Sequence, residues 1–204
     1  FLSEHPKFLR NPLYISGTSY VGIIVPKVTL ELYEGAEHGD QPLNIQGYIL
    51  CSPLTNKFMD FNSRLEYAHR MALISDDIYK SDIEKAMNKW ANTEVVQQAL
   101  KVRQKLSSKN CRALIFSGDH DFTFPYVGVE QWITSLNLHI EVPWKPFYVD
   151  DQVGGYEMKY ANNNYSLTFA TVKGGGHSVP LYSPKESLVL AKQWFSTHIY
   201  SSAS

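Results

Sequence analysis

The chain alternates between short apolar runs and longer segments with helical periodicity. Unbroken apolar runs of this length are typical of strands buried on both faces of a sheet, and the longer segments repeat their apolar positions at the helical period. The predicted strands lie at residues 13–17, 45–51, 113–116 and from 167 onward, and the predicted helices at 23–32, 126–138 and 184–198. Strands that alternate with helices predict an α/β fold with a largely parallel sheet and right-handed crossover connections.

Three other segments complete the pattern. Residues 34–44 are rich in turn-forming residues and predict a connector. Residues 62–103 are helix-rich, and Asn92 can cap a helix within them. Residues 140–166 contain two prolines and a Gly-Gly pair, so we expect irregular structure there. The sequence shows no internal repeat, and its length predicts a single domain over residues 1–204.

Ser19 lies where the first predicted strand meets the first predicted helix, between Gly17 and Gly22. A serine between a strand and a helix, in a sharp turn kept open by glycines, is the pattern of a nucleophile elbow. The hydroxyl would then face the amino end of a helix at the carboxyl edge of the sheet. In the usual elbow, however, the second glycine follows two residues after the serine, whereas here it follows three residues after. Taken alone, the Gly-x-Ser pattern fits an ordinary strand-to-helix turn better.

An acid and a histidine also follow predicted strands. Asp119 and Asp121 lie in the polar cluster after residues 113–116, and His177 follows three consecutive glycines. Taken alone, the aspartates fit a turn and His177 fits a loop histidine. The carboxyl ends of parallel strands meet at one sheet edge, and the order serine, aspartate, histidine is that of α/β-hydrolases. Histidine can accept the proton of a weakly nucleophilic serine, and a carboxylate orients that histidine. Ser19, Asp121 and His177 are therefore a predicted catalytic triad.

On these motifs the chain resembles the serine carboxypeptidase-like family of α/β-hydrolases, particularly its plant acyltransferase branch. The resemblance covers nearly the whole chain, and its most specific part is the run Leu-x-x-Ala-x-Val-x-Gly-Gly-Gly-His-x-Val-Pro-x-x-x-Pro from Leu167 to Pro184. It implies part of an α/β-hydrolase fold, with a mostly parallel sheet flanked by helices. It also implies Ser19 as nucleophile, His177 as base and Asp121 as the triad acid. The backbone amide of Tyr20 then resembles one donor of an oxyanion hole.

The chain departs from the family pattern in ways that bear on its organisation. Phe1 begins inside what resembles a helix. We therefore expect residues 1–204 to form one α/β-hydrolase-like domain without the family's amino-terminal portion, which supplies the other oxyanion amide and the first strands. Residues 62–110 resemble a shortened form of the family's helical insertion. Cys51 and Ser52 stand where the family commonly has Gly-Asn.

Thr18 bears on the substrate. Its position, a candidate part of the substrate pocket, holds glutamate in the family's peptidases and usually aspartate in its acyltransferases. Threonine cannot share a proton with the terminal carboxylate of a peptide, which disfavours exopeptidase action.

The resemblance implies acyl chemistry that needs no cofactor. Ser19 would take an acyl group from an acyl-glucose ester and pass it to an alcohol or amine activated by His177. A serine carboxypeptidase acting on peptides is the first alternative. The second is a silent chain, or one that depends on the missing amino-terminal segment as a separate partner chain, because loss of one oxyanion donor lowers turnover about a hundredfold or more.

Composition excludes several other classes. Apolar residues make up 44% of the 204 residues and the net charge is −1. No basic tract indicates nucleic acid or an anionic membrane surface, and no apolar run is long enough to span a bilayer. The histidines form no i, i+4 pair with a glutamate, so we expect no metal.

The cysteines and one sequon complete the candidate chemistry. Cys51 and Cys111 lack metal-binding spacing, and a disulfide between them is the less favoured alternative to free thiols. Asn164 begins the glycosylation sequon Asn-Tyr-Ser. A glycoprotein would suit the secretory pathway, with a vacuolar or extracellular destination, as the family resemblance implies.

Overall fold

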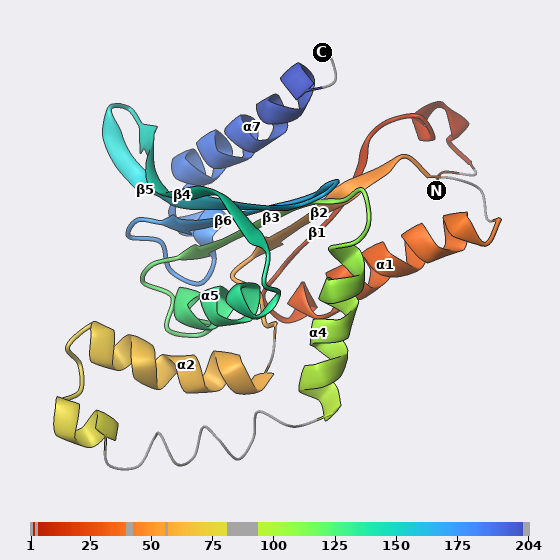
Figure 1. Ribbon diagram of the computed structural model, residues 1–204. Coiled ribbons are helices and arrows are strands. Elements are labelled where there is room, and N and C mark those ends of the chain that lie inside the picture. Colours follow the sequence, from red (N-terminus) through yellow and green to blue (C-terminus); the bar gives the residue numbers. More distant parts are fainter. Residues whose placement is uncertain (1, 3, 40–42, 56, 81–93, 202–204) are drawn as a thin grey trace.

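A six-stranded sheet with helices on both faces organises the chain (Figure 1). The computed structural model describes residues 2, 4–39, 43–55, 57–80 and 94–201. Its strands are β1 (Leu13–Thr18), β2 (Ile45–Cys51), β3 (Arg112–Gly118), β4 (His139–Val149), β5 (Gln152–Asn162) and β6 (Tyr165–Val172), in the spatial order β1-β2-β3-β6-β5-β4. The pairs β1–β2, β2–β3 and β3–β6 are parallel, whereas β5 and β4 are antiparallel additions. The predicted α/β class with a mostly parallel sheet is therefore confirmed.

Helical segments precede, connect and follow the strands. They are the 3₁₀ turns η1 (Pro6–Phe8) and η2 (Ser19–Gly22), and the α-helices α1 (Ile24–Glu37), α2 (Lys57–Arg70), α4 (Glu94–Leu106), α5 (Tyr126–Ser135), α6 (Val179–Tyr182) and α7 (Pro184–Ser201). Helices α1, α2, α4 and α5 lie on one side of the sheet and α7 on the other (Figure 1). Helix α5 ends before the expected residue 138, because Asn137 adopts a left-handed φ of 52°.

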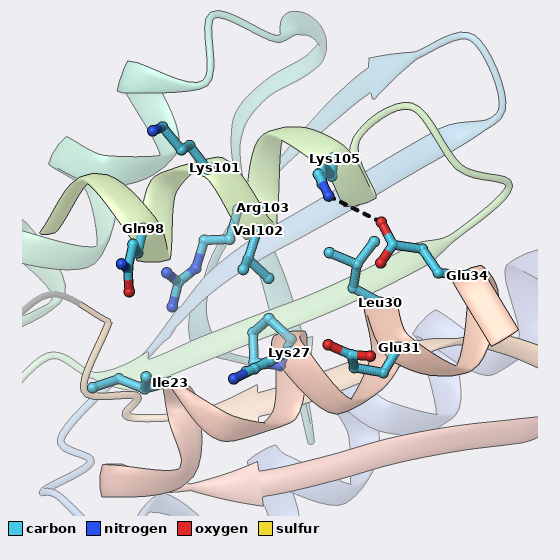
Figure 2. Close-up of a pocket in the computed structure, with 11 residues that line it drawn as sticks. Ile23, Lys27, Leu30, Glu31, Glu34, Gln98, Lys101, Val102, Arg103 and Lys105 are labelled. Atoms are coloured by element: carbon cyan, nitrogen blue, oxygen red, sulfur yellow. Dashed lines mark hydrogen bonds and ion pairs between the residues drawn. The ribbon is translucent and has the colours of Figure 1, made fainter. Parts of the chain in front are cut away.

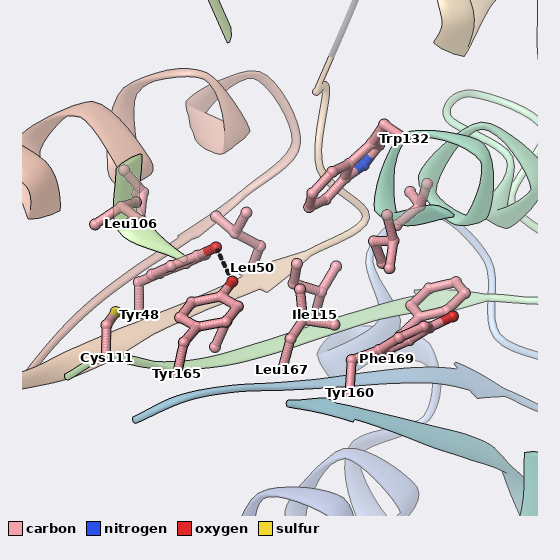
Figure 3. Packing of buried hydrophobic residues seen from close by; sticks show 14 of the residues in the cluster. Tyr48, Leu50, Leu106, Cys111, Ile115, Trp132, Tyr160, Tyr165, Leu167 and Phe169 are labelled. Atoms are coloured by element: carbon pink, nitrogen blue, oxygen red, sulfur yellow. Dashed lines mark hydrogen bonds between the residues drawn. The ribbon is translucent and has the colours of Figure 1, made fainter. Parts of the chain in front are cut away.

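The sheet separates two apolar clusters, and β3 contributes to both with the period of two expected for a strand. Ala113 and Ile115 pack in the cluster beneath α1, α4 and α5, whereas Leu114 and Phe116 face the cluster that includes Leu190 of α7. Figure 3 shows the first cluster, in which two buried tyrosines, Tyr48 and Tyr165, meet through their hydroxyls at 3.2 Å. This two-sided burial explains why the central strands read as unbroken apolar runs.

Residues 140–166 are not irregular, so this sequence expectation is wrong. They form most of the β4–β5 hairpin and the start of β6. Strand β4 pairs only with β5 in the described sheet, and its outer edge tolerates proline, which cannot donate a backbone hydrogen bond. The Gly-Gly pair serves close strand approach: a Cβ on Gly155 would lie 1.9 Å from the carbonyl oxygen of Thr171 on β6.

Helix α1 also extends beyond the sequence prediction. Its last turn, which we expected in a connector over residues 34–44, is helical to Glu37. Glu34 lies 3.1 Å from the ammonium of Lys105, and Glu37 lies 2.5 Å from that of Lys109. The last turn of α1, whose sequence alone indicates a loop, is thus joined by ion pairs to α4 and to the segment that follows α4.

Some expectations fall outside the described residues. They are Asn92 as a helix cap, residues 40–42 of the connector and residues 81–93 of the expected insertion. Around them, α2 and α4 confirm the helix-rich character of residues 62–103. The domain boundaries, 1–204 with an insertion at 62–110, stay a prediction. No helix in the described ranges is both long and apolar enough to cross a membrane.

Candidate active site

Ser19 occupies a sharp turn at the end of β1. Its φ of 63° lies in the left-handed region, which non-glycine residues adopt rarely and mostly where the surroundings hold them. The turn leaves no room at Gly17, where a Cβ would lie 2.3 Å from the Cγ2 of Val21. The carbonyl oxygen of Ser19 accepts a 2.8 Å hydrogen bond from the amide of Leu54, which follows the neighbouring strand β2. The local geometry is that of a nucleophile elbow, although the Gly-x-Ser pattern taken alone fitted an ordinary strand-to-helix turn better.

The structure brings Ser19, His177 and Asp121 together. His177 Nε2 lies 2.9 Å from Ser19 Oγ, and His177 Nδ1 lies 2.9 Å from Asp121 Oδ2. With the proton on Nδ1, the imidazole donates to the carboxylate and leaves Nε2 to accept the serine proton. The three side chains follow β1, β3 and β6; β3 and β6 are neighbours in the sheet, and only β2 lies between β1 and β3. The arrangement can deprotonate the hydroxyl as it attacks a carbonyl carbon.

Backbone amides hold the Asp121 carboxylate. The residue is only 1% exposed, and its Oδ1 accepts hydrogen bonds from the amides of Thr123 at 2.8 Å and Phe124 at 3.1 Å. The ring of Phe124 stands edge-on to the His177 imidazole, with centroids 5.3 Å apart. Phe124 was missed by the sequence analysis. Its only signal is its place between the polar cluster and the proline that precedes α5.

A second aspartate ties the acid loop to the histidine loop. Asp119 Oδ1 accepts a 2.7 Å hydrogen bond from the amide of Gly174, and the amide of His120 donates to the carbonyl oxygen of Gly175 at 2.9 Å. The hydroxyl of Tyr67 on α2 donates to the carbonyl oxygen of Asp119 at 2.8 Å. These bonds fix the spacing of the two loops, so Asp119 supports the site without contacting His177 Nε2 or Ser19.

Thr18 and Tyr20 flank the serine. Thr18 is exposed at the end of β1 and pairs in register with Cys51 of β2. Tyr20 is 64% exposed, and its amide belongs to the first turn of η2, where backbone N–H groups have no partner within the helix. Both residues therefore lie at the same sheet edge as Ser19.

The nearest thiol is not a competing nucleophile at neutral pH. Cys51 and Cys111 are both free and buried. Burial raises the pKa of the Cys51 thiol to about 11 and that of Cys111 to about 12. The thiols stay protonated in the core, where they behave as small apolar groups. Among the described residues, no group of three histidine, cysteine or acidic side chains could hold a metal ion.

Asn164 lies at the turn between β5 and β6. Asn162 pairs with Tyr165, so only Asn163 and Asn164 form the connection, and Asn164 is exposed. The left-handed φ of 51° at Asn163 suits such a short connection. The sequon asparagine therefore lies on the surface, away from the three side chains that meet at Ser19.

Two sequence comparisons with known proteins agree on one family. The family model for serine carboxypeptidases matches residues 1–89 and 79–197. Serine carboxypeptidase-like 16 of Arabidopsis thaliana is 34% identical over 276 residues, which cover 96% of this chain and 62% of the relative. Serine carboxypeptidase-like 17 of the same plant is 32% identical with similar coverage. The chain thus spans less than two thirds of these relatives, and the 276-residue alignment is longer than the chain itself.

A solved structure shares the fold. A prohormone-processing carboxypeptidase from Saccharomyces cerevisiae superposes with a TM-score of 0.69 at 12% sequence identity, covering 89% of this chain and 61% of that one. At that identity the likeness concerns the architecture of the sheet and its helices.

Proposed function

Because the chain belongs to the serine carboxypeptidase family, we propose that it transfers acyl groups through a covalent intermediate on Ser19. The observation that carries this proposal is the pair of 2.9 Å contacts from His177 to Ser19 and to Asp121. His177 Nε2 takes the hydroxyl proton as Ser19 Oγ attacks the acyl carbonyl, and Asp121 stabilises the imidazolium. His177 then gives the proton to the leaving alcohol, and the acyl group stays on Ser19.

The second half-reaction regenerates the serine. An acceptor alcohol or amine gives its proton to His177 Nε2 while its oxygen or nitrogen attacks the acyl carbonyl, and His177 returns the proton to Ser19 Oγ. The amide of Tyr20 is the proposed oxyanion donor in both steps. The proposed donor is an acyl-glucose ester and the proposed acceptor is a small alcohol or amine, with no cofactor.

Thr18 supports transfer over peptide hydrolysis. It lies beside Ser19 and is exposed at the sheet edge, yet it carries no carboxyl that could share a proton with a peptide's terminal carboxylate. The competing function is that of a serine carboxypeptidase, and the yeast protein that shares the fold is itself a carboxypeptidase. Both functions use the same triad, so substitution of Thr18, beside the serine, is the experiment that distinguishes them.

Parallel assays of wild type and Thr18→Glu test this choice. We expect the wild type to form ester from an acyl-glucose donor and an alcohol faster than it hydrolyses an N-acyl dipeptide. Thr18→Glu should shift the ratio of the two rates toward the dipeptide by about tenfold, since a carboxyl can accept the substrate's terminal group. Thr18→Gln, which has the same size but no acid, is the matched control. Dipeptide hydrolysis without any ester formation by the wild type would replace acyl transfer with the carboxypeptidase function.

The free edge of β1 bears on a partner chain. Within the described sheet, β1 pairs only with β2, which leaves a row of backbone groups at the other edge. The segment that follows β1 also carries three exposed apolar side chains spaced four residues apart, Tyr20, Ile24 and Val28. We propose that this surface accepts the family's amino-terminal segment as a separate chain, which would supply the second oxyanion donor. The matching alternative is a chain that is catalytically silent alone.

Addition of that segment tests the partner proposal. The corresponding amino-terminal segment of serine carboxypeptidase-like 16 can be co-expressed with this chain. Labelling of Ser19 by a fluorophosphonate should then accelerate about a hundredfold, the size of one oxyanion donor. Equal labelling with and without the segment would contradict the dependence on a partner. A silent chain would stay unlabelled in both preparations.

Three further proposals concern organisation and location. Residues 62–110 are proposed to be a shortened insertion, supported by the two family-model matches that meet at residues 79–89. Residues 1–204 are proposed to form a single domain. Exposure of Asn164 supports glycosylation, and with it passage through the secretory pathway to the vacuole or the cell exterior. Loss of an endoglycosidase-sensitive mass shift in Asn164→Gln, expressed in plant cells, tests the last point.

A further inference from the structure

A charged side chain is buried behind the serine turn. Arg103 projects from α4 and is only 2% exposed. Burial lowers its pKa, since the interior disfavours the charged guanidinium. A buried guanidinium is costly unless hydrogen bonds and nearby carboxylates compensate it, so its contacts identify what it stabilises.

The contacts of Arg103 lead to the two segments that form the serine turn. Its Nη2 donates to the carbonyl oxygen of Gly22 at 3.0 Å, at the end of η2. Its Nη1 lies 3.4 Å from the carbonyl oxygen of Thr55, just after β2. The guanidinium also lies over the ring of Trp132, with its carbon 4.7 Å from the ring centroid. One planar group thus joins the segment after β1 to the segment after β2.

These contacts close a ring around Ser19. Leu54, adjacent to Thr55, donates its amide to the carbonyl oxygen of Ser19 at 2.8 Å. The ring runs from Ser19 along the backbone to Gly22, across the guanidinium to Thr55, and back through Leu54. A backbone with φ of 63° at Ser19 persists only when its surroundings hold it, and this ring is such a surrounding.

A buried carboxylate fixes the far side of the ring to α2. Asp60 is fully buried, and its Oδ2 accepts a 2.6 Å hydrogen bond from the amide of Thr55. Its Oδ1 accepts a 3.1 Å hydrogen bond from the Thr55 hydroxyl. The negative charge of Asp60 also favours the charged form of Arg103. The Thr55 end of the ring is therefore anchored to α2 through Asp60, and the guanidinium itself projects from α4.

We propose that Arg103 is a positioning residue for the Ser19 nucleophile, which it keeps at the angle that faces His177. The proposal rests on the proposed acyl-enzyme function. Figure 2 shows Arg103 extending from α4 into the space between α4 and α1, where it lines a groove of about 460 Å³. Small displacements of a nucleophile lower reactivity strongly, because the reacting atoms must stay close to the productive geometry.

Variants of Arg103 separate positioning from folding. Arg103→Met removes the guanidinium and its charge, whereas Arg103→Lys keeps the charge but replaces the planar guanidinium by one ammonium group. Leu106→Ala is the matched structural control, because Leu106 is fully buried on the same helix but no hydrogen bond joins its side chain to the serine turn. Each variant is labelled with a fluorophosphonate at a temperature where circular dichroism shows the folded state. The maximal rate constant, the half-saturating probe concentration and the labelled fraction are measured.

A positioning role predicts a distinct pattern. Arg103→Met should lower the maximal rate constant 10- to 100-fold with an unchanged half-saturating concentration, and Arg103→Lys should recover part of it. Leu106→Ala should lower the midpoint of thermal unfolding but label at the wild-type rate constant. The proposal is overturned if Arg103→Met labels as fast as wild type, or if Leu106→Ala slows labelling by the same factor.

Hydrogen exchange gives a readout that does not need activity. Exchange of the Leu54 amide, which donates to Ser19, should accelerate at least tenfold in Arg103→Met and stay unchanged in Lys101→Met, an exposed position on α4. If the wild type is labelled neither alone nor with the amino-terminal segment added, the proposed function fails, and this exchange alone decides whether the hydrogen bond from Leu54 to Ser19 depends on Arg103. An unchanged exchange rate of the Leu54 amide in Arg103→Met would overturn the proposal that Arg103 holds the serine turn.

Discussion

The four parallel strands and the β4–β5 hairpin share one sheet but differ in what their ends carry. Strands β1, β3 and β6 each lead into a loop that holds one of the three side chains meeting at Ser19. Strands β4 and β5 are joined by Asp150 and Asp151 alone, both with left-handed φ values. A parallel strand needs a long crossover, which leaves room for polar side chains at its carboxyl end, whereas a hairpin returns at once. The reactive groups are therefore concentrated in the parallel half.

The largest expected difference between the two regions is in the labelling rates of variants at two buried carboxylates, one in each region. Asp121→Asn keeps the shape of the side chain but no longer stabilises the imidazolium, so we expect fluorophosphonate labelling of Ser19 to slow about 10³- to 10⁴-fold. Glu157→Gln, on β5, is the matched control, because Glu157 is also buried but pairs with Lys145 and Lys159 of the hairpin. Its labelling rate should match the wild type. A loss below tenfold in Asp121→Asn would argue against the proposed acid.

Alanine variants of two glycines, one in the parallel half and one in the hairpin, should give an effect of intermediate size on the labelling rate. A Cβ on Gly118 would lie 2.0 Å from the carbonyl oxygen of Gly175, and a Cβ on Gly155 would lie 1.9 Å from that of Thr171. Both alanine variants should lose about 1–3 kcal/mol of unfolding free energy, measured by urea titration. Only Gly118→Ala moves the loop that holds His177, so it alone should slow labelling, by about 10- to 100-fold. Equal rates in the two folded variants would contradict this division.

The smallest effect concerns alkaline stability. The folded-state pKa of Cys51 is about 11, against a usual value of 9.0, so the native chain holds this proton where the unfolded chain has lost it. The stabilisation is complete below pH 9 and falls by about 1.4 kcal/mol for each pH unit up to about 11. Urea titrations at pH 8 and 10.5 should show a smaller decline in Cys51→Ala. An identical decline in both proteins would exclude Cys51 as a contributor. The β4–β5 hairpin contains no cysteine, so it does not contribute to the difference in alkaline stability between wild type and Cys51→Ala.

The sequence predicts the parallel half well because its local signals agree with the tertiary environment. The predicted strand at 45–51 coincides with β2, and the polar clusters after residues 116 and 172 do lie at one sheet edge. The sequence predicted that the three candidate side chains meet because each follows a predicted strand and because their order along the chain is that of α/β-hydrolases. The elbow at Ser19 forms although Gly22 is displaced by one residue from the usual pattern.

The β4–β5 hairpin and the contacts of Arg103 behind the serine turn could not be predicted in the same way. Prolines and paired glycines normally interrupt strands, and only the outer position of β4 and the close approach of β5 to β6 make them fit. Arg103 contacts carbonyl groups 48 and 81 residues away, so no local pattern marks it. An arginine on an amphipathic helix is ordinarily expected at the surface.

Labelling of the intact chain with a fluorophosphonate, followed by peptide mapping, tests the central assignment most directly. We expect one adduct on Ser19 that is absent in Ser19→Ala and forms at least a thousandfold more slowly in His177→Ala. The partner-dependent alternative predicts the same adduct only after the amino-terminal segment is added. A folded chain that stays unlabelled in both preparations, or one labelled equally in His177→Ala, would contradict the proposed nucleophile and its base.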